Sequence, residues 1–322
     1  MSLSNEHIQW AYRLFFDREP EDEKAIEYHL GVSKDTRQLR VRFLSSQEFK
    51  ENNVQIPYLP RLGIMPPMSI DLKISDEQRD QLMKVVQEKW EKLGASEPHW
   101  SVLIQDDYKT KKISENKTTF YDTGKIEAEV FEKTLMRNGF DLSEFKTCLE
   151  LGCGVGRITR WLAQYFEMVH ALDISKYHLE IAEEHTRNEG IENIQFHRVN
   201  TVLKFLELPK VDCFFSLIAL QHNPPPVAEF ILEKLCKCLN KNGIGYFQIA
   251  TYNKGYKFDA NEYLTTECNQ HDIEMHFLPQ KRVFELLDQC DCAPIEVVTD
   301  QCTGGPSTEL SNTFFVQKRT RN

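Results

Sequence analysis

The chain has 322 residues, of which 41% are hydrophobic and 27% are charged. This composition is sufficient for a sizeable buried core and differs from that of an intrinsically disordered protein. The 39 basic and 49 acidic residues give a net charge of −10, so we expect no general basic surface for a phosphate backbone, and nucleic acid is not the expected partner.

The absence of several sequence motifs excludes further classes of protein. The longest apolar runs, such as residues 213–220, are too short to span a bilayer, and the first residues lack the basic and apolar regions of a secretory signal. None of the nine cysteines forms a Cys-x-x-Cys pair, and there is no His-Glu-x-x-His. We therefore expect free thiols in a reducing, cytoplasmic setting, with no membrane span and no metal site.

Residues 1–52 are predicted to form a small helical module. Apolar residues recur there at the spacing of one helix face: Ile8, Ala11, Tyr12, Phe15 and Phe16. A second helix is predicted over residues 21–30 and a third around residues 39–44. Residues 45–48, Ser-Ser-Gln-Glu, indicate a capping box that opens one more turn.

Residues 53–119 are predicted to be a proline-rich linker and a helical extension. Four prolines lie between residues 54 and 70, which leaves no room for a helix. Ser75 and Gln78 then indicate a capping box, and the helix that it opens is expected to end at Gly94. Residues 95–120 are predicted to be irregular.

From Lys146 onward, apolar runs of strand length alternate with helical patterns. The runs cover residues 147–151, 168–172, 194–199, 211–220 and 244–250, and two more strands are expected at 295–299 and 312–318. Such alternation is typical of βαβ units. We therefore predict an α/β, Rossmann-like domain over residues 120–322, with a mostly parallel seven-stranded sheet and helices on both faces.

A glycine-rich turn follows the first predicted strand. Residues 150–157, Glu-Leu-Gly-Cys-Gly-Val-Gly-Arg, carry glycines at alternate positions before a helix. Glycine permits a tight turn and the close approach of a ligand to the backbone, and the helix start adds partial positive charge. In a dinucleotide site a glycine would stand where this chain has Arg157, which disfavours a nicotinamide dehydrogenase.

Two polar residues end the next predicted strands. Asp173 ends the second strand, where an acid can accept hydrogen bonds from both hydroxyls of a ribose. Asn200 ends the third strand, where an amide can meet the edge of an adenine. Because the carboxyl ends of parallel strands share one edge of the sheet, these residues and the glycine-rich turn together predict a nucleoside site.

By these motifs and their order, residues 120–322 resemble the class I S-adenosylmethionine-dependent methyltransferases. The resemblance implies S-adenosyl-L-methionine as cofactor, with its methionine part on the glycine loop, its ribose at Asp173 and its adenine at Asn200, where the family more often has Asp. In this family the segment upstream of the first strand usually lends an aromatic or polar contact, and residues 120–124, Phe-Tyr-Asp-Thr-Gly, resemble that segment. The implied cofactor-binding residues are Tyr121, Glu150, Gly152, Cys153, Gly154, Gly156, Asp173, Ile174, Asn200 and Leu220.

Three residues are candidates for acid or base chemistry. His222 follows the fourth predicted strand, at the edge that faces the cleft, and is the first candidate for a general base. The alternative is that His222 forms a hydrogen bond to the backbone and only fixes the loop. The aromatic segment 253–272 is placed either to cover an acceptor pocket or to form the core of a small subdomain, and Glu274 and His276 after it are second candidates.

The predicted reaction is an in-line transfer of the methyl group to a hydroxyl or amine of a small-molecule or glycan acceptor. The glycan preference comes from residues 1–52, which are similar to small helical modules attached to bacterial surface-glycan proteins and which leave a protein partner open. Two alternatives remain: a non-catalytic cofactor-binding protein recruited by this module, and an N-methyltransferase of nucleic acid. Asn223-Pro-Pro resembles the motif of the latter, but Pro226 stands where that motif has an aromatic residue.

Overall fold

The structure is a computed structural model that describes residues 3–52, 66–265, 273–300, 302–303 and 309–319. The chain divides into two compact units, Met1–Pro60 and Arg61–Asn322. Residues 76–119, which we expected to be an extension ahead of the second domain, therefore belong to the second unit. None of the helices in the described part of the chain combines the length and the apolar character that a membrane crossing requires.

The first unit consists of α1 (Asn5–Phe16), α2 (Glu23–Val32), α3 (Thr36–Ser45) and α4 (Gln47–Asn52). The predicted helices are confirmed, and the buried residues of α1 pack against those of α3 to form a small core: Ile8, Ala11, Tyr12, Leu39 and Phe43. The cap of α4 is shifted by one residue from the prediction. The hydroxyl of Ser46, and not of Ser45, accepts from the backbone N–H of Phe49 at 3.1 Å.

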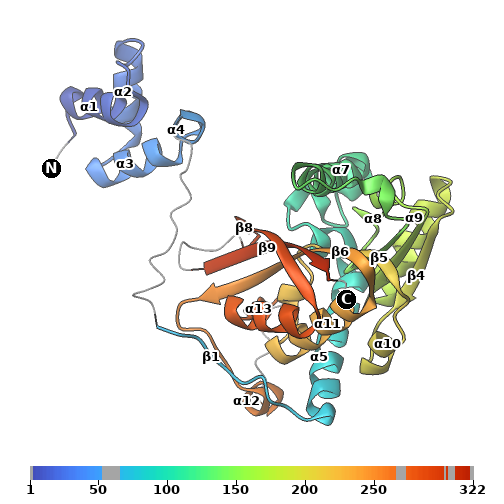
Figure 1. Cartoon of the computed structure of the whole chain (residues 1–322). Coiled ribbons are helices and arrows are strands. Elements are labelled where there is room, and N and C mark those ends of the chain that lie inside the picture. Colours follow the sequence, from blue (N-terminus) through green and yellow to red (C-terminus); the bar gives the residue numbers. More distant parts are fainter. Residues whose placement is uncertain (1–2, 53–65, 266–272, 301, 304–308, 320–322) are drawn as a thin grey trace. The chain divides into compact units, whose positions relative to one another are not determined.

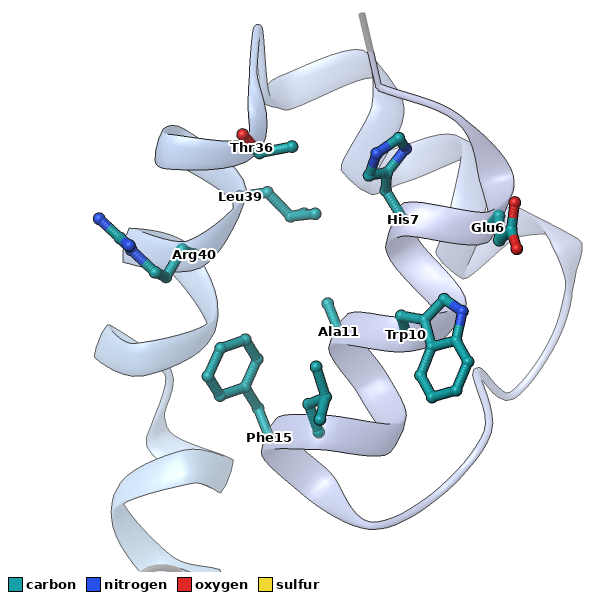
Figure 2. Close-up of a pocket in the computed structure, with 9 residues that line it drawn as sticks. Glu6, His7, Trp10, Ala11, Phe15, Thr36, Leu39 and Arg40 are labelled. Atoms are coloured by element: carbon teal, nitrogen blue, oxygen red, sulfur yellow. The ribbon is translucent and has the colours of Figure 1, made fainter. Parts of the chain in front are cut away.

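A hollow of about 320 Å³ lies between α1 and α3 of this unit (Figure 2). Trp10 and Leu14 line it on α1 and keep 50% and 72% of their surfaces exposed. Polar side chains, among them those of Glu6, His7 and Arg40, also border it. A protein partner for residues 1–52 stays a prediction.

The second unit is built on a seven-stranded sheet (Figure 1). Its strands in spatial order are β4 (Ile194–Arg198), β3 (Met168–Asp173), β2 (Thr147–Leu151), β5 (Val211–Ser216), β6 (Leu239–Asn253), β9 (Glu309–Lys318) and β8 (Cys292–Asp300). Neighbours are parallel from β4 to β6, and β9 is antiparallel to β6 and β8. The predicted mostly parallel sheet is confirmed. From β2 the chain adds β3 and β4 on one side and then β5 and β6 on the other. Parallel α/β sheets bind ligands at the point where the strand order reverses in this way.

Helices bury both faces of this sheet. The helices of the unit are α5 (Asp76–Ser96), α6 (Pro98–Val102), α7 (Ile113–Arg137), α8 (Thr159–Leu162), α9 (Lys176–Asn188), α10 (Val202–Leu206), α11 (Pro225–Cys238), α12 (Ala260–Thr265) and α13 (Gln280–Gln289). Phe214 of β5 packs in a core with α5, α10, α11 and α13, whereas Phe215 packs with α7 and α8 on the other face. Because successive side chains of a strand alternate between faces, a strand covered on both sides is apolar throughout.

The prediction of an irregular segment over residues 95–120 is wrong. α6 and the beginning of α7 lie there, and residues 120–124 are part of α7. The buried residues of α7 follow helical spacing: Phe120, Tyr121, Gly124, Ala128, Phe131 and Leu135. Gly124 and the β-branched Thr118 and Thr119 have low helix propensity, and burial of this face overrides it.

Candidate functional site

A cavity of about 710 Å³ lies at the carboxyl ends of the parallel strands. The glycine loop after β2, Asp173 at the end of β3 and His222 after β5 all line it. Side chains of α5, α6, α10 and α11 complete its wall, among them Met83, Trp90, Val102, Phe205 and Ile231. The cavity therefore joins residues that the sequence places more than 70 positions apart.

The glycine loop has a backbone that other residues would strain. Gly152 has φ of 76°, and a Cβ atom on it would lie 2.4 Å from the Cβ atom of Ala219. At Gly154, with φ of 53°, a Cβ atom would lie 2.6 Å from a methyl group of Val102. Both positions therefore require glycine, and side chains there would fill the space beside the loop.

Three amides of this loop are engaged within the protein. The N–H groups of Gly152 and Cys153 donate to the carbonyl oxygen of Leu172, at 2.8 and 3.1 Å. The N–H of Gly154 donates to Oδ2 of Asp173 at 2.9 Å. These hydrogen bonds fasten the loop to β3 and hold its shape.

Asp173 is buried and joins the loop to the next helix. Its Oδ1 accepts from the N–H of Ser175 at 2.9 Å, and Ser175 caps α9. Each oxygen of the carboxylate thus accepts one backbone N–H. A carboxylate oxygen has a second lone pair, so Asp173 retains the capacity to accept hydroxyl groups from the cavity that it lines.

Glu150, the last residue but one of β2, is a buried acid with an unsatisfied oxygen. Its Oε2 has no hydrogen-bond partner among the described residues. Burial raises the pKa of Glu150 to about 7, although the Thr159 hydroxyl and the Arg157 guanidinium act in the opposite direction. A cationic donor in the cavity would satisfy this oxygen and favour the ionised form.

His222 lies at the end of a short 3₁₀ helix, Leu220–His222, which Figure 1 leaves unlabelled. Its Nδ1 lies 2.7 Å from the carbonyl oxygen of Glu274, and because only an N–H can bond to a carbonyl, Nδ1 carries the proton. Desolvation lowers the pKa of His222 to about 4. The ring is therefore neutral at pH 7, with Nε2 as its unprotonated nitrogen.

Glu274 and His276 do not line the cavity; Ile273 and Met275, which alternate with them, do. The Glu274 carboxylate lies 2.6 Å from Nζ of Lys89 and accepts from the Tyr263 hydroxyl at 2.5 Å. Burial opposes ionisation of Glu274, but hydrogen bonds from His276, Lys89 and Tyr263 outweigh it and lower its pKa to about 2. Acid or base roles for this pair stay predictions.

Comparisons with known proteins agree with this geometry. Residues 148–243 match a family model described as a methyltransferase domain. Magnesium protoporphyrin IX methyltransferase from Synechocystis, solved with bound S-adenosylmethionine, has a similar fold: 15% of residues are identical, the TM-score is 0.50, and the match covers 78% of this chain and 100% of that one. Residues 148–243 thus match a methyltransferase domain, and the second unit, called the methyltransferase domain below, has the fold of S-adenosylmethionine-dependent methyltransferases.

Curated relatives of the methyltransferase domain differ in the acceptors that their names give. A ubiquinone biosynthesis O-methyltransferase from Haemophilus ducreyi is 28% identical over 165 residues, which is 47% of this chain and 65% of that protein. Phosphoethanolamine N-methyltransferase 2 from Caenorhabditis elegans is 28% identical over 134 residues, which is 41% of this chain and 30% of that protein. The chain thus spans less than two thirds of the length of either relative.

The residues of the methyltransferase domain fit S-adenosylmethionine in two respects. The unpartnered Oε2 of Glu150 suits the ammonium group of the methionine part, and the open lone pairs of Asp173 suit the ribose hydroxyls. The glycine loop between them leaves the space that side chains would fill. Cys153 and Ile174 line the same cavity.

Four residues of the predicted cofactor set do not line the cavity. Tyr121 lies behind the glycine loop, where its hydroxyl donates to the carbonyl oxygen of Val155 at 3.2 Å. Gly156 faces Ala182 of α9, and Leu220 is buried in the core. Asn200 also lies outside the lining, and its neighbour Val199 is part of it. Direct cofactor contacts by these four stay predictions.

Several residues that line the cavity of the methyltransferase domain could not be predicted from local sequence patterns. The apolar stripe of α5 indicates a buried helix face, but it does not show that Met83, Val86 and Trp90 reach a ligand cavity. Residues 101–104 lie in the segment that we predicted to be irregular. The aromatic pair His99-Trp100 in this segment indicates that part of it is packed against the rest of the protein.

Proposed function

We propose that this chain transfers a methyl group from S-adenosylmethionine to a hydroxyl or amine of a small-molecule acceptor. The observation that carries the proposal is one cavity lined by Glu150 with its unpaired oxygen, by Asp173 on the next strand and by His222. The names of the two curated relatives, an O-methyltransferase and an N-methyltransferase, are consistent with either acceptor atom.

The cofactor, when bound, supplies an electrophilic methyl group on a positively charged sulfur. Glu150 and Asp173 bind its polar ends and orient it, and the apolar wall excludes water from the reacting atoms. Charge disperses in the transition state of such a displacement, so an apolar cavity suits it and positioning provides most of the rate gain.

His222 is the proposed base for a hydroxyl acceptor. Its unprotonated Nε2 can take the proton as the acceptor oxygen attacks. The low pKa of His222 keeps this nitrogen available throughout the neutral range. A neutral amine acceptor would need no proton removal before its attack.

The cavity favours a neutral acceptor with an apolar body. Among the described lining residues, the acidic and basic side chains other than histidine are Glu150, Asp173 and Arg157, all at the glycine loop or the end of β3. The remaining wall is mainly apolar and includes Met83, Val86, Trp90, Ile231 and Met275. A glycan acceptor stays a prediction that no observation in the second unit favours.

The test is release of S-adenosylhomocysteine from S-adenosylmethionine across a panel of phenols, aliphatic alcohols, amines and sugars. We expect turnover with a neutral acceptor that has an apolar body. A protein that binds the cofactor but gives no product with any acceptor would be the non-catalytic alternative. Turnover of nucleic acid, with binding that weakens steeply as salt rises, would indicate the other alternative.

The cofactor site has its own test. Asp173→Ala should abolish binding of S-adenosylmethionine in a calorimetric titration and leave the far-ultraviolet circular dichroism unchanged. Asp141→Ala is the control, because Asp141 caps a surface turn away from the cavity lining. An unchanged dissociation constant for Asp173→Ala would show that Asp173 does not bind the ribose.

A further inference from the structure

Residues 273–278, called the strap below, form one wall of the cavity and are fastened by their backbone. The N–H of His276 donates to the carbonyl oxygen of Gln221 at 2.7 Å, and that of Leu278 donates to the carbonyl oxygen of Ala250 at 3.0 Å. The side chains of Ile273 and Met275 line the cavity. Those of Glu274 and His276 instead enter a polar cluster with Lys89, Tyr256 and Tyr263.

The carboxylate of Glu274 is the centre of this cluster. It receives Nζ of Lys89 at 2.6 Å, the hydroxyl of Tyr263 at 2.5 Å and Nε2 of His276 at 3.4 Å. The side chains of Lys89 and Glu274 are only 16% and 17% exposed, so solvent screens this ion pair much less than a surface pair. The pair ties the strap to α5.

The backbone of Glu274 holds His222. Its carbonyl oxygen accepts from Nδ1 of His222 at 2.7 Å, which selects one of the two neutral forms of the imidazole ring. The ring centroid of Trp90 also lies 5.4 Å from that of His222. Trp90 follows Lys89 directly on α5. The Glu274 carbonyl and the Trp90 ring, which both contact His222, therefore belong to the two members of this ion pair or to the residue beside one of them.

We propose that the Lys89–Glu274 ion pair positions His222: it fixes the strap, so that the Glu274 carbonyl holds the ring as the Nδ1–H form and leaves Nε2 without a proton. Glu274 and Lys89 are thus positioning residues, and neither contacts the reacting atoms. The inference rests on the proposed function, in which Nε2 takes the proton of the acceptor.

The direct readout is the side-chain ¹⁵N spectrum of His222 in the full-length protein, uniformly ¹⁵N-labelled, at pH 7 and without cofactor. The signals are assigned by their loss in His222→Gln. We expect only the Nδ1–H form in the wild type and a mixture of both neutral forms in Glu274→Gln and Lys89→Met. If both variants keep a single Nδ1–H form, the proposal is overturned.

Two further variants make this test decisive. Glu229→Gln is the matched control and should keep the wild-type spectrum. Glu229 pairs with Arg282 at the same distance of 2.6 Å, its side chain is 19% exposed, and it does not line the cavity. If one single variant fails to fold, the double variant Lys89→Met/Glu274→Gln, which leaves no unpaired charge, decides by the same spectrum.

Turnover supplies a second readout that a purely structural role would not give. With any hydroxyl acceptor that the wild type methylates, Glu274→Gln should lower kcat by about tenfold or more and change KM for S-adenosylmethionine by less than about twofold. An unchanged kcat would contradict the proposal. If the wild type methylates no acceptor, the proposed function fails, while the spectrum of His222 still decides the positioning role.

Discussion

Glu150 is the residue whose protonation should couple cofactor binding to pH. Burial raises its pKa to about 7 in the free protein, so below that pH most molecules carry a protonated acid. A bound cation favours the carboxylate, so binding below pH 7 must release a proton. The dissociation constant of S-adenosylmethionine should therefore rise by up to about tenfold for each pH unit below 7, and change little between pH 7 and the pKa of the cofactor's ammonium group, about 8.

This linkage is measured by titration calorimetry at pH 6 in two buffers of different ionisation enthalpy. The wild type should release close to one proton at saturation. Glu150→Gln should bind more weakly and release none, because its amide does not titrate. Equal proton release by the variant would assign the linkage to another group.

His222 and two other histidines should make folding depend on pH. Desolvation lowers the pKa of His222, His99 and His185 to about 4 in the folded protein, against about 6.5 in an unfolded chain. Between these values the unfolded chain binds protons that the folded chain does not. The free energy of unfolding should therefore be highest above pH 6.5 and fall as the pH is lowered to 4.

Urea unfolding at a series of pH values from 7.5 to 4 measures this effect. Gln does not titrate, so His222→Gln should show a smaller decrease over the same window than the wild type. Identical slopes for the two proteins would mean that His222 is not held neutral by its surroundings.

At the scale of elements, α7 supports the glycine loop. The indole N–H of Trp161 donates to the carbonyl oxygen of Tyr121 at 2.9 Å, and Arg157 donates to the hydroxyl of Thr123 at 3.2 Å. Gly124 lets the two backbones meet, because a Cβ atom on it would lie 2.0 Å from the carbonyl oxygen of Arg157. Residues 120–124, which resemble a segment that contacts the cofactor, thus lie in a helix behind the glycine loop.

Gly124→Ala should consequently push α7 away from this loop. We expect a loss of stability of about 1 to 3 kcal/mol, the usual cost of overpacking, and weaker binding of S-adenosylmethionine. Thermal unfolding and titration calorimetry measure the two effects. Gly31→Ala on α2 is the control: nothing lies within 4 Å of the new Cβ atom, and alanine favours the helix. Equal effects of both substitutions would contradict the close contact.

The strands could be predicted more reliably than the helices that border the cavity. Phe214 and Phe215 are apolar neighbours because each packs on a different face, which gives the continuous runs that the sequence shows. α7 was not predicted, because Gly124 and two threonines mask the helical spacing at its start and no helix was expected between residues 95 and 146. Only tertiary packing decides such a case.

On the scale of the whole molecule, the two units have separate cores. The core of the first unit is formed by residues from Ile8 to Phe43, and the cavity is lined by residues of the second unit alone among the described residues. A chain of residues 61–322 should therefore fold, and it should bind S-adenosylmethionine with the dissociation constant of the full chain. Circular dichroism and calorimetry check this. Aggregation or a weakened affinity would show that residues 1–60 contribute to the second unit.

The site could be predicted where it depends on strand order and not where it depends on packing. Glu150, Asp173 and His222 each lie at or just beyond a strand end, and the ends of parallel strands share one edge. Trp90 reaches the same cavity from a helix before the sheet, and Met275 reaches it from the strap, which lies between β6 and β8 in the chain. No local pattern at either residue indicates that position, so sequence reasoning could not name them.

The position of the strap limits how the set of acceptors that the enzyme accepts could change. Met275 lines the cavity in which we propose that the acceptor binds, and the backbone carbonyl of the preceding residue accepts from His222, so one segment contributes to both. Substitutions there would alter selectivity and proton removal together. Met83 and Val86 on α5 line the cavity but do not hold His222. Directed evolution toward larger acceptors should therefore accumulate its tolerated changes on that helix.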